Sequence, residues 1–180
     1  MYGGYCFFNN AAIAAQALVA GGAARVAILD IDYHHGNGSQ QLFYRRGDVL
    51  YLSLHADPAR AYPYYSGTAD ERGAGPGEGL NRNWPLPERA DGPRYLAALD
   101  QALGLARDFA PDAPLIISAG FDTFHTDPIA DLALQTDDYR AIGAAVRDLG
   151  LATVVIQEGG YAVDALGANV ISLLDGLRGA

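Results

Sequence analysis

The chain has 180 residues, half of them hydrophobic, and a formal net charge of −9 at pH 7. This length predicts one domain, residues 1–180. An acidic chain repels phosphate backbones, so direct binding to nucleic acid is not expected. No apolar stretch reaches the roughly 18 residues that span a membrane, and no signal peptide is visible, so we expect a cytoplasmic protein without membrane contact. The single cysteine, Cys6, excludes an internal disulfide.

Short apolar runs alternate with amphipathic stretches along the chain. In chain order we expect a helix over 11–20, strands over 26–31 and 49–54, a helix over 93–109, a strand over 115–118, a helix over 137–149, a strand over 153–156 and a helix over 163–177. Asn10 and Thr136 are the expected N-caps of the first and third helices. The strands are continuous in Val, Ile and Leu, as in strands buried on both faces. The alternation therefore predicts an α/β fold with a parallel sheet flanked by helices.

A polar cluster follows each predicted strand directly. These clusters cover residues 30–37, 53–57, 122–127 and 158–161. In open α/β sheets the active site lies at the carboxyl ends of the strands, so the four clusters are expected to meet at one rim.

The first cluster contains Asp30, Asp32 and His34 at a spacing of two residues. In a strand, residues i, i+2 and i+4 point to the same face. Two carboxylates buried side by side are costly without a cation, and two oxygens with an imidazole suit zinc or another first-row divalent ion. The alternative is a strand end with two solvated aspartates and a hydrogen-bonded histidine.

The remaining clusters add a third ligand and a phenol. Asp122 follows an apolar strand and is a candidate third ligand, although it could also cap a turn. We interpret the nearby pair Asp127-Pro128 as a turn. Two glycines before Tyr161 would let the backbone approach a metal and bring the phenol over it, where it could stabilise an oxyanion. A plain loop is the alternative for this segment.

Taken together, these segments resemble the histone deacetylase family, most closely the bacterial acetylpolyamine amidohydrolases. The matching motifs are GGYCFFNN at 3–10, LDIDYHHGNG at 29–38, SLH at 53–55, PGEGLNRNWPLP at 76–87, SAGFDTFHTDP at 118–128 and EGGY at 158–161. The resemblance implies an arginase-like three-layer α/β fold and a zinc-dependent hydrolase that removes acetyl groups from amines. The acetylated amine could be acetyl-lysine in proteins or an acetylpolyamine.

The resemblance also implies roles for individual positions. Asp32, His34 and Asp122 match the zinc ligands, and Tyr161 matches the residue that polarises the acetyl carbonyl. Asp30 matches a carboxylate that orients an active-site histidine, and Asn37 stands where some members have an aspartate facing a second histidine. A structural potassium site is implied at Asp30, Asp32, His34, Ser53 and Leu54. The substrate channel is implied to involve Gly4, Tyr5, Tyr62, Gly160 and Ile129.

The sequence departs from the family pattern in one respect. The family has a His-His pair shortly before the Gly-Tyr-Cys motif, and this sequence begins at Met1-Tyr2-Gly3. We therefore expect an N-terminally truncated domain with little deacetylase activity, for which His125 is the only conceivable substitute base. The alternatives are a truncated metal-binding protein without activity and a two-metal ureohydrolase of the same fold. We also expect an uncovered sheet surface beside the first strand, through which the chain should aggregate or form a homodimer unless it stays partly folded.

Overall fold

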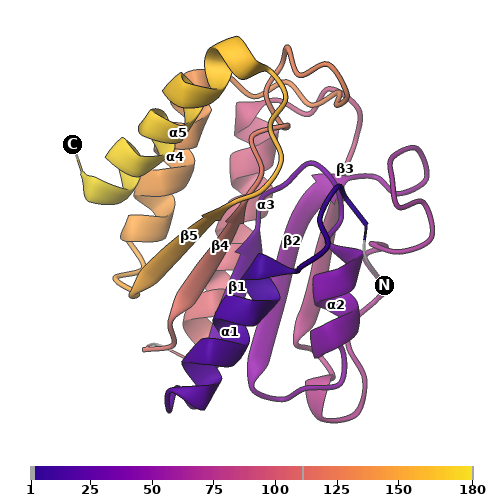
Figure 1. Ribbon diagram of the computed structural model, residues 1–180, viewed down its shortest axis with the longest axis vertical. Helices are drawn as coiled ribbons and strands as arrows, with labels where there is room; N and C mark the ends of the chain where they lie inside the picture. Colours follow the sequence, from indigo (N-terminus) through magenta and orange to yellow (C-terminus); the bar gives the residue numbers. More distant parts are fainter. Residues whose placement is uncertain (1–2, 111, 180) are drawn as a thin grey trace.

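The computed structural model describes residues 3–110 and 112–179, which form a five-stranded parallel sheet covered by helices (Figure 1). The strands are β1 (Val26–Asp30), β2 (Val49–Ala56), β3 (Asn81–Leu86), β4 (Leu115–Ala119) and β5 (Thr153–Gln157). Their order across the sheet is β3-β2-β1-β4-β5, and every neighbouring pair is parallel. All carboxyl ends of the strands therefore lie at one edge of the sheet.

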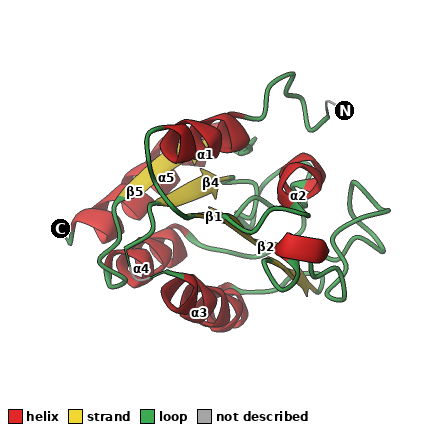
Figure 2. Ribbon diagram, turned by 90° about the horizontal axis from the view of Figure 1, so that it is seen from below, coloured by secondary structure: helices red, strands yellow, loops and turns green. Residues whose placement is uncertain are grey.

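Helices cover both faces of the sheet and make three layers (Figure 2). The helices are α1 (Asn10–Ala20), α2 (Asn37–Phe43), α3 (Gly92–Phe109), α4 (Thr136–Arg147) and α5 (Val163–Arg178), with a short 3-10 helix, η1, at Gly75–Gly77. One buried cluster joins α1 and α2 to one face of the sheet, and the other joins α3, α4 and α5 to the opposite face.

Alternate residues of β1 show why its sequence is apolar throughout. Val26 and Ile28 pack on the side of α1, whereas Ala27 and Leu29 pack on the side of α3. All four are fully buried, as expected of a parallel strand covered on both faces. The predicted α/β fold with a parallel sheet between helices is confirmed.

Two elements were not predicted, because their sequences lack the usual periodicity. The edge strand β3 reads NRNWPL, with asparagine at two buried positions and a proline, which an edge strand tolerates. The short helix α2 opens with Asn37-Gly38, a pair typical of turns.

The expected N-caps were each wrong by one residue. The side chain of Asn9, not Asn10, accepts a hydrogen bond from the Ala12 backbone at 2.8 Å. Gln135, not Thr136, is the N-cap of α4 and forms a capping box with Asp138. In both helices the predicted cap is the first helical residue, because the capping side chain must lie three residues before the amide that it accepts from.

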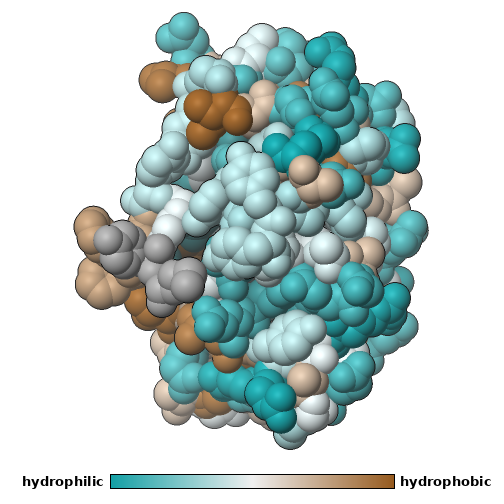
Figure 3. All heavy atoms as spheres, turned by 90° about the vertical axis from the view of Figure 1, so that its right-hand side faces the viewer, coloured by the Kyte–Doolittle hydropathy of each residue, from teal (hydrophilic) through white to brown (hydrophobic). Residues whose placement is uncertain are grey.

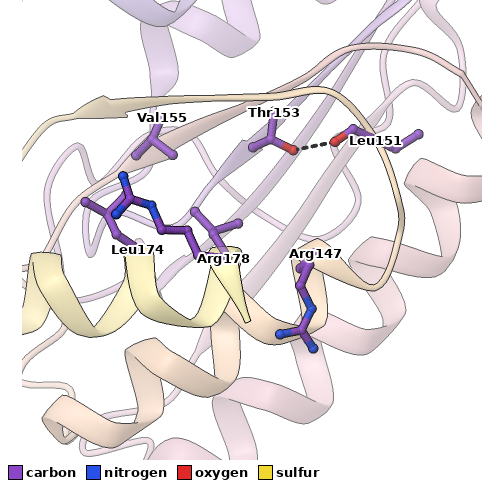
Figure 4. Close-up of a pocket in the computed structure, with 7 residues that line it drawn as sticks. Arg147, Leu151, Thr153, Val155, Leu174 and Arg178 are labelled. Carbon is purple, nitrogen blue, oxygen red and sulfur yellow. Dashed lines mark hydrogen bonds between the residues drawn. The ribbon is translucent and has the colours of Figure 1, made fainter. Parts of the chain in front are cut away.

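The expected uncovered surface beside the first strand is also wrong. β1 is the central strand, bonded to β2 and β4, and its five residues are all buried. The exposed edge is instead β5, which pairs only with β4 among the described residues and has Val154 43% exposed. A hollow of about 310 Å³ lies between β5 and the end of α5, where Val155 and Thr153 face Leu174 and Arg178 (Figure 4). By contrast, the side of the molecule that carries α2 and the opposite sheet edge is mostly hydrophilic (Figure 3).

Candidate metal centre

The segment that follows β1 is shaped by turns rather than by strand alternation. β1 ends at Asp30, so the prediction that Asp30, Asp32 and His34 share one strand face is wrong. Instead, the amide of Asp32 donates to Asp30 Oδ1 at 3.2 Å, and the amide of His34 donates to Asp32 Oδ1 at 2.8 Å. Two successive aspartate turns of this kind hold the side chains of Asp32 and His34 together.

The side chains of Asp32, His34 and Asp122 meet at the carboxyl ends of β1 and β4. His34 Nδ1 lies 3.0 Å from Asp122 Oδ2 and 3.3 Å from Asp32 Oδ1. One ligand atom from each residue lies within 4.8 Å of the others. Ligands about 2.0–2.2 Å from a tetrahedral zinc ion are roughly 3.4 Å apart, so this donor set fits a single ion of that kind.

Backbone amides orient the two carboxylates of this triad. Asp122 is fully buried, and its Oδ1 accepts the amide of Tyr33 at 2.8 Å, which leaves Oδ2 facing His34. Asp32 Oδ2 accepts the amide of Gly159 at 3.1 Å. Such supporting hydrogen bonds fix ligand orientation before a metal arrives.

The electrostatics of the triad favour a bound cation. Burial raises the pKa of the Asp122 carboxyl, and the charge of Asp32 raises it further. The pKa of Asp30 is raised by the same two causes, as is that of Glu158. Burial alone would lower the pKa of His34, but the hydrogen bonds that its imidazole donates to the carboxylates of Asp122 and Asp32 raise that pKa to about 10. A divalent ion would relieve the repulsion that these shifts report.

Two glycines let the backbone approach the carboxylates closely. A Cβ atom at Gly159 would lie 2.6 Å from Asp122 Oδ2 and 2.7 Å from Asp32 Oδ2. A Cβ atom at Gly120 would lie 2.2 Å from Asp32 Oδ2. Any side chain at either position would displace the triad. Both glycines were visible in the sequence, but only the fold places them against the carboxylates.

Tyr161 lies on the turn that passes this triad. Gly160 precedes it with φ of +134°, a conformation that favours glycine. Burial raises the pKa of the Tyr161 phenol to about 12, and the charges of Asp122 and Asp32 contribute. The ring of Tyr5 stands 6.1 Å away, edge to face, and that of Tyr62 stands 6.3 Å from His34. A phenol and two further aromatic rings thus border the triad.

Comparison with known proteins agrees with this geometry. The model of the histone deacetylase domain matches residues 1–177. The chain belongs to the histone deacetylase family. It is 54% identical over 178 residues to acetylpolyamine amidohydrolase 1 of Pseudomonas aeruginosa, and the match covers 99% of this chain and 51% of that protein.

Solved structures of family members superpose closely on the fold. The acetylpolyamine aminohydrolase of Burkholderia pseudomallei has a TM-score of 0.93 at 48% identity, covering 97% of this chain and 51% of that chain. A histone deacetylase homologue from Aquifex aeolicus has a TM-score of 0.92 at 30% identity, covering 98% of this chain and 48% of that one. The chain therefore spans about half the length of the relatives that it matches.

Three of the positions that the family resemblance assigned to a potassium site lie on the neighbouring strands β1 and β2, whereas Asp32 and His34 lie in the turns that follow β1. Asp30 and Ser53 are register partners, and Leu54 follows Ser53 in the buried part of β2. Asp30 Oδ2 accepts a hydrogen bond from Tyr51 at 2.7 Å. Ser53 donates to His55 Nδ1 at 2.7 Å, which leaves its oxygen lone pairs able to bind a cation.

The positions assigned to the substrate channel are spread around the rim. Gly4 and Tyr5 both have positive φ, and Tyr5 is 84% exposed. Ile129 is also exposed and donates its amide to Asp127. The side chain of Asn37 is not part of the triad and donates to the Tyr65 hydroxyl at 2.8 Å.

The other three histidines are engaged elsewhere. His35 and His55 are buried with ring centroids 4.6 Å apart, where His35 Nε2 bonds Gln40 and His55 Nε2 bonds the Gly67 carbonyl. His125 is exposed, and its Nδ1 lies 3.3 Å from the Leu134 carbonyl. Each of these imidazoles has a structural partner, so no one of them is held as a second imidazole of the triad.

Asp127 is the functional candidate that sequence analysis passed over, because the following proline indicated a simple turn. Its carboxylate is buried and accepts the amides of both Ile129 and Tyr161. Only the fold brings Tyr161 within reach of Asp127.

Across the described residues, no helix is both long and apolar enough to cross a membrane.

Proposed function

We propose that this chain carries the metal centre of a zinc-dependent hydrolase that removes acetyl groups from amines. The observation that supports this most is the triad of Asp32, His34 and Asp122 beneath the Gly-Gly turn that carries Tyr161. The family membership of the chain and the names of its relatives favour the same chemistry. A bound zinc ion would supply Lewis acidity at the acetyl carbonyl and lower the pKa of a water molecule.

Tyr161 is proposed to stabilise the oxyanion. Its phenol donates a hydrogen bond to the carbonyl oxygen as negative charge develops there. With a pKa raised to about 12, the phenol keeps its proton at neutral pH and remains a donor. Tyr5 and Tyr62 are proposed to flank the alkyl chain of the amine, with Gly4, Gly160 and Ile129 along the channel.

The substrate is proposed to be acetyl-lysine or an acetylated polyamine. A net charge of −9 attracts the remaining ammonium groups of a polyamine over long range. Aromatic rings at the rim suit a methylene chain that ends in a cation. Relatives named for acetylpolyamines favour the second substrate class for a first assay.

Turnover by these 180 residues alone is proposed to be slow. Two carboxylates and one imidazole would neutralise more of a bound metal's charge than three imidazoles, so water activated there would be less acidic and would depend more on a general base. His35, His55 and His125 are all bonded elsewhere. Loss of general acid-base assistance typically costs about 10²–10⁴-fold in rate.

A structural potassium ion is proposed as a second bound cation. Its oxygen ligands would come from the end of β1 and the turns after it (Asp30, Asp32 and His34) and from β2 (Ser53 and Leu54). Burial of the Asp30 carboxyl beside Asp32, which raises its pKa, indicates a place where a further cation is stabilising. A higher melting temperature in potassium chloride than in choline chloride at equal ionic strength is the expected result.

Metal content and turnover, measured together, test the proposal. We expect about one zinc per chain, loss of zinc in Asp122→Asn, and retained zinc with lower turnover of N-acetylputrescine in Tyr161→Phe. His125→Ala serves as the control and should leave both unchanged. One bound zinc without any turnover would reduce the chain to a metal-binding protein, and two per chain would point to a two-metal ureohydrolase instead.

A further inference from the structure

Asp127 lies in the loop between β4 and α4 and is 7% exposed. Its Oδ1 accepts the amide of Ile129 at 3.1 Å, which is an ordinary aspartate turn. Its Oδ2 accepts the amide of Tyr161 at 2.8 Å, from a residue 34 positions further along the chain. The turn alone does not require this second bond, so the bond needs another explanation.

The carboxylate of Asp127 has no cationic partner within the described part of the chain. Burying an ionised carboxylate without a partner is costly, and backbone N–H donors are what offset that cost here. The two donors belong to Ile129, which is proposed to line the mouth of the substrate channel, and to the turn that bears the phenol. One buried carboxylate thus joins both segments.

The turn that carries Tyr161 is held at few other points. Gly159 donates its amide to Asp32 and accepts the amide of Phe121 at 2.9 Å, and the Tyr161 carbonyl accepts from Val163 at 2.9 Å. Gly160 between them has φ of +134° and, as a glycine, has more conformational freedom than any other residue would have there. The bond to Asp127 comes directly after this glycine, where the backbone most needs a restraint.

We propose that Asp127 is a positioning residue that fixes the Tyr161 phenol over the metal ligands and links it to the channel mouth at Ile129. The proposal rests on the oxyanion role given to Tyr161 under the proposed function. Among the described residues, the side chain of Asp127 hydrogen-bonds Ile129 and Tyr161 and none of the three triad residues, so its loss should disturb the phenol without disturbing zinc binding.

Amide exchange of Tyr161 tests the backbone part without any metal or substrate. In Asp127→Asn the negative charge is lost and the amide nitrogen cannot accept, so the bond to the Tyr161 amide is weakened or lost whichever way the side chain turns. We expect the Tyr161 amide of the zinc-free chain to exchange about tenfold faster in Asp127→Asn than in the parent. Asp137→Asn, the same substitution at an exposed position on α4, is the matched control and should leave the exchange rate unchanged.

A double-mutant cycle on ligand affinity tests the phenol part. Acetohydroxamate, a zinc chelator with an acetyl carbonyl, is titrated into the zinc-loaded chain. We expect about fivefold weaker binding in Asp127→Asn, about tenfold in Tyr161→Phe, and no further loss when both are combined. Zinc affinity should be equal in all four proteins.

The two measurements separate the possible failures. Unchanged exchange of the Tyr161 amide in Asp127→Asn would overturn the positioning role, and so would additive losses of hydroxamate affinity. Equal hydroxamate affinity in Tyr161→Phe and the parent would instead remove the oxyanion role of Tyr161, with amide exchange still deciding the role of Asp127. If Asp127→Asn does not fold, Asp127→Glu, which keeps the charge and moves the carboxylate by one methylene, takes its place with the same expected outcomes.

Discussion

Replacing Gly159 with alanine should abolish tight zinc binding while leaving the fold intact. The new Cβ would lie 2.6 Å from Asp122 Oδ2, whereas ordinary contacts begin at 3.4 Å, so the atoms must separate by about 0.8 Å (3.4 − 2.6). Zinc–ligand distances tolerate only about 0.2 Å. The position has no positive φ, so alanine strains the site through contact alone.

The expected loss exceeds that of a typical supporting residue. Mutating groups that orient metal ligands costs about 10–100-fold in metal affinity, and here two ligands are displaced at once. We therefore expect at least about 100-fold weaker zinc binding, equivalent to about 2.7 kcal/mol. Competition with a fluorescent zinc chelator at pH 7 measures the affinity, and circular dichroism of the zinc-free protein checks the fold.

Gly167→Ala is the control for this substitution. Gly167 lies exposed in α5 with no atom within 4 Å of a new Cβ, so alanine there should leave zinc affinity unchanged and raise stability by up to about 1 kcal/mol. A Gly159→Ala protein that binds zinc within about threefold of the parent would refute the close approach of the turn to the triad, and with it the assignment of Asp32 and Asp122 as ligands.

Three further predictions follow from the charges and surfaces. Because the pKa of metal-free His34 is raised to about 10, zinc must displace its proton, and affinity should rise about tenfold per pH unit between pH 6 and 8; a flat profile by chelator competition would exclude His34 as a ligand. Burial lowers the pKa of His35 to about 4 and of His55 to about 3, below the usual value of 6.5, so the stability that they contribute is present above about pH 6.5 and lost as pH falls toward 3. For His35 this stability is roughly 3 kcal/mol. The free energy of unfolding, measured with urea, should fall less steeply from pH 7 to pH 4 in His55→Asn than in the parent. Finally, the open β5 edge should pair with a second copy of the chain, so sedimentation should detect dimers that Val154→Lys disrupts and that Ile171→Lys, on an exposed face of α5, does not.

The sequence by itself determined four of the five strands, most of the helices and the residue types of the metal centre. Buried parallel strands such as β1 and β4 must be apolar on both faces, so runs such as VAILD and LIISA can be recognised as strands from the sequence alone. The residue types around Asp32 and His34 indicated a metal site, and the family resemblance implied which of them are the zinc ligands.

The tertiary structure decided what depends on approach between distant segments. Asp32 and His34 converge through aspartate turns rather than strand alternation, because β1 stops at Asp30. β3 and α2 form because of their packing against neighbouring elements, since their own sequences lack the usual periodicity. The strand order β3-β2-β1-β4-β5 puts β1 in the middle of the sheet and β5 at its open edge. Asp127 acquires its importance from Tyr161, which lies 34 positions away along the chain, and Gly159 acquires its importance from Asp32, which lies 127 positions away; both pairs are within hydrogen-bond distance in space. Local sequence patterns report periodicity and propensity, and they carry no information about such long-range contacts.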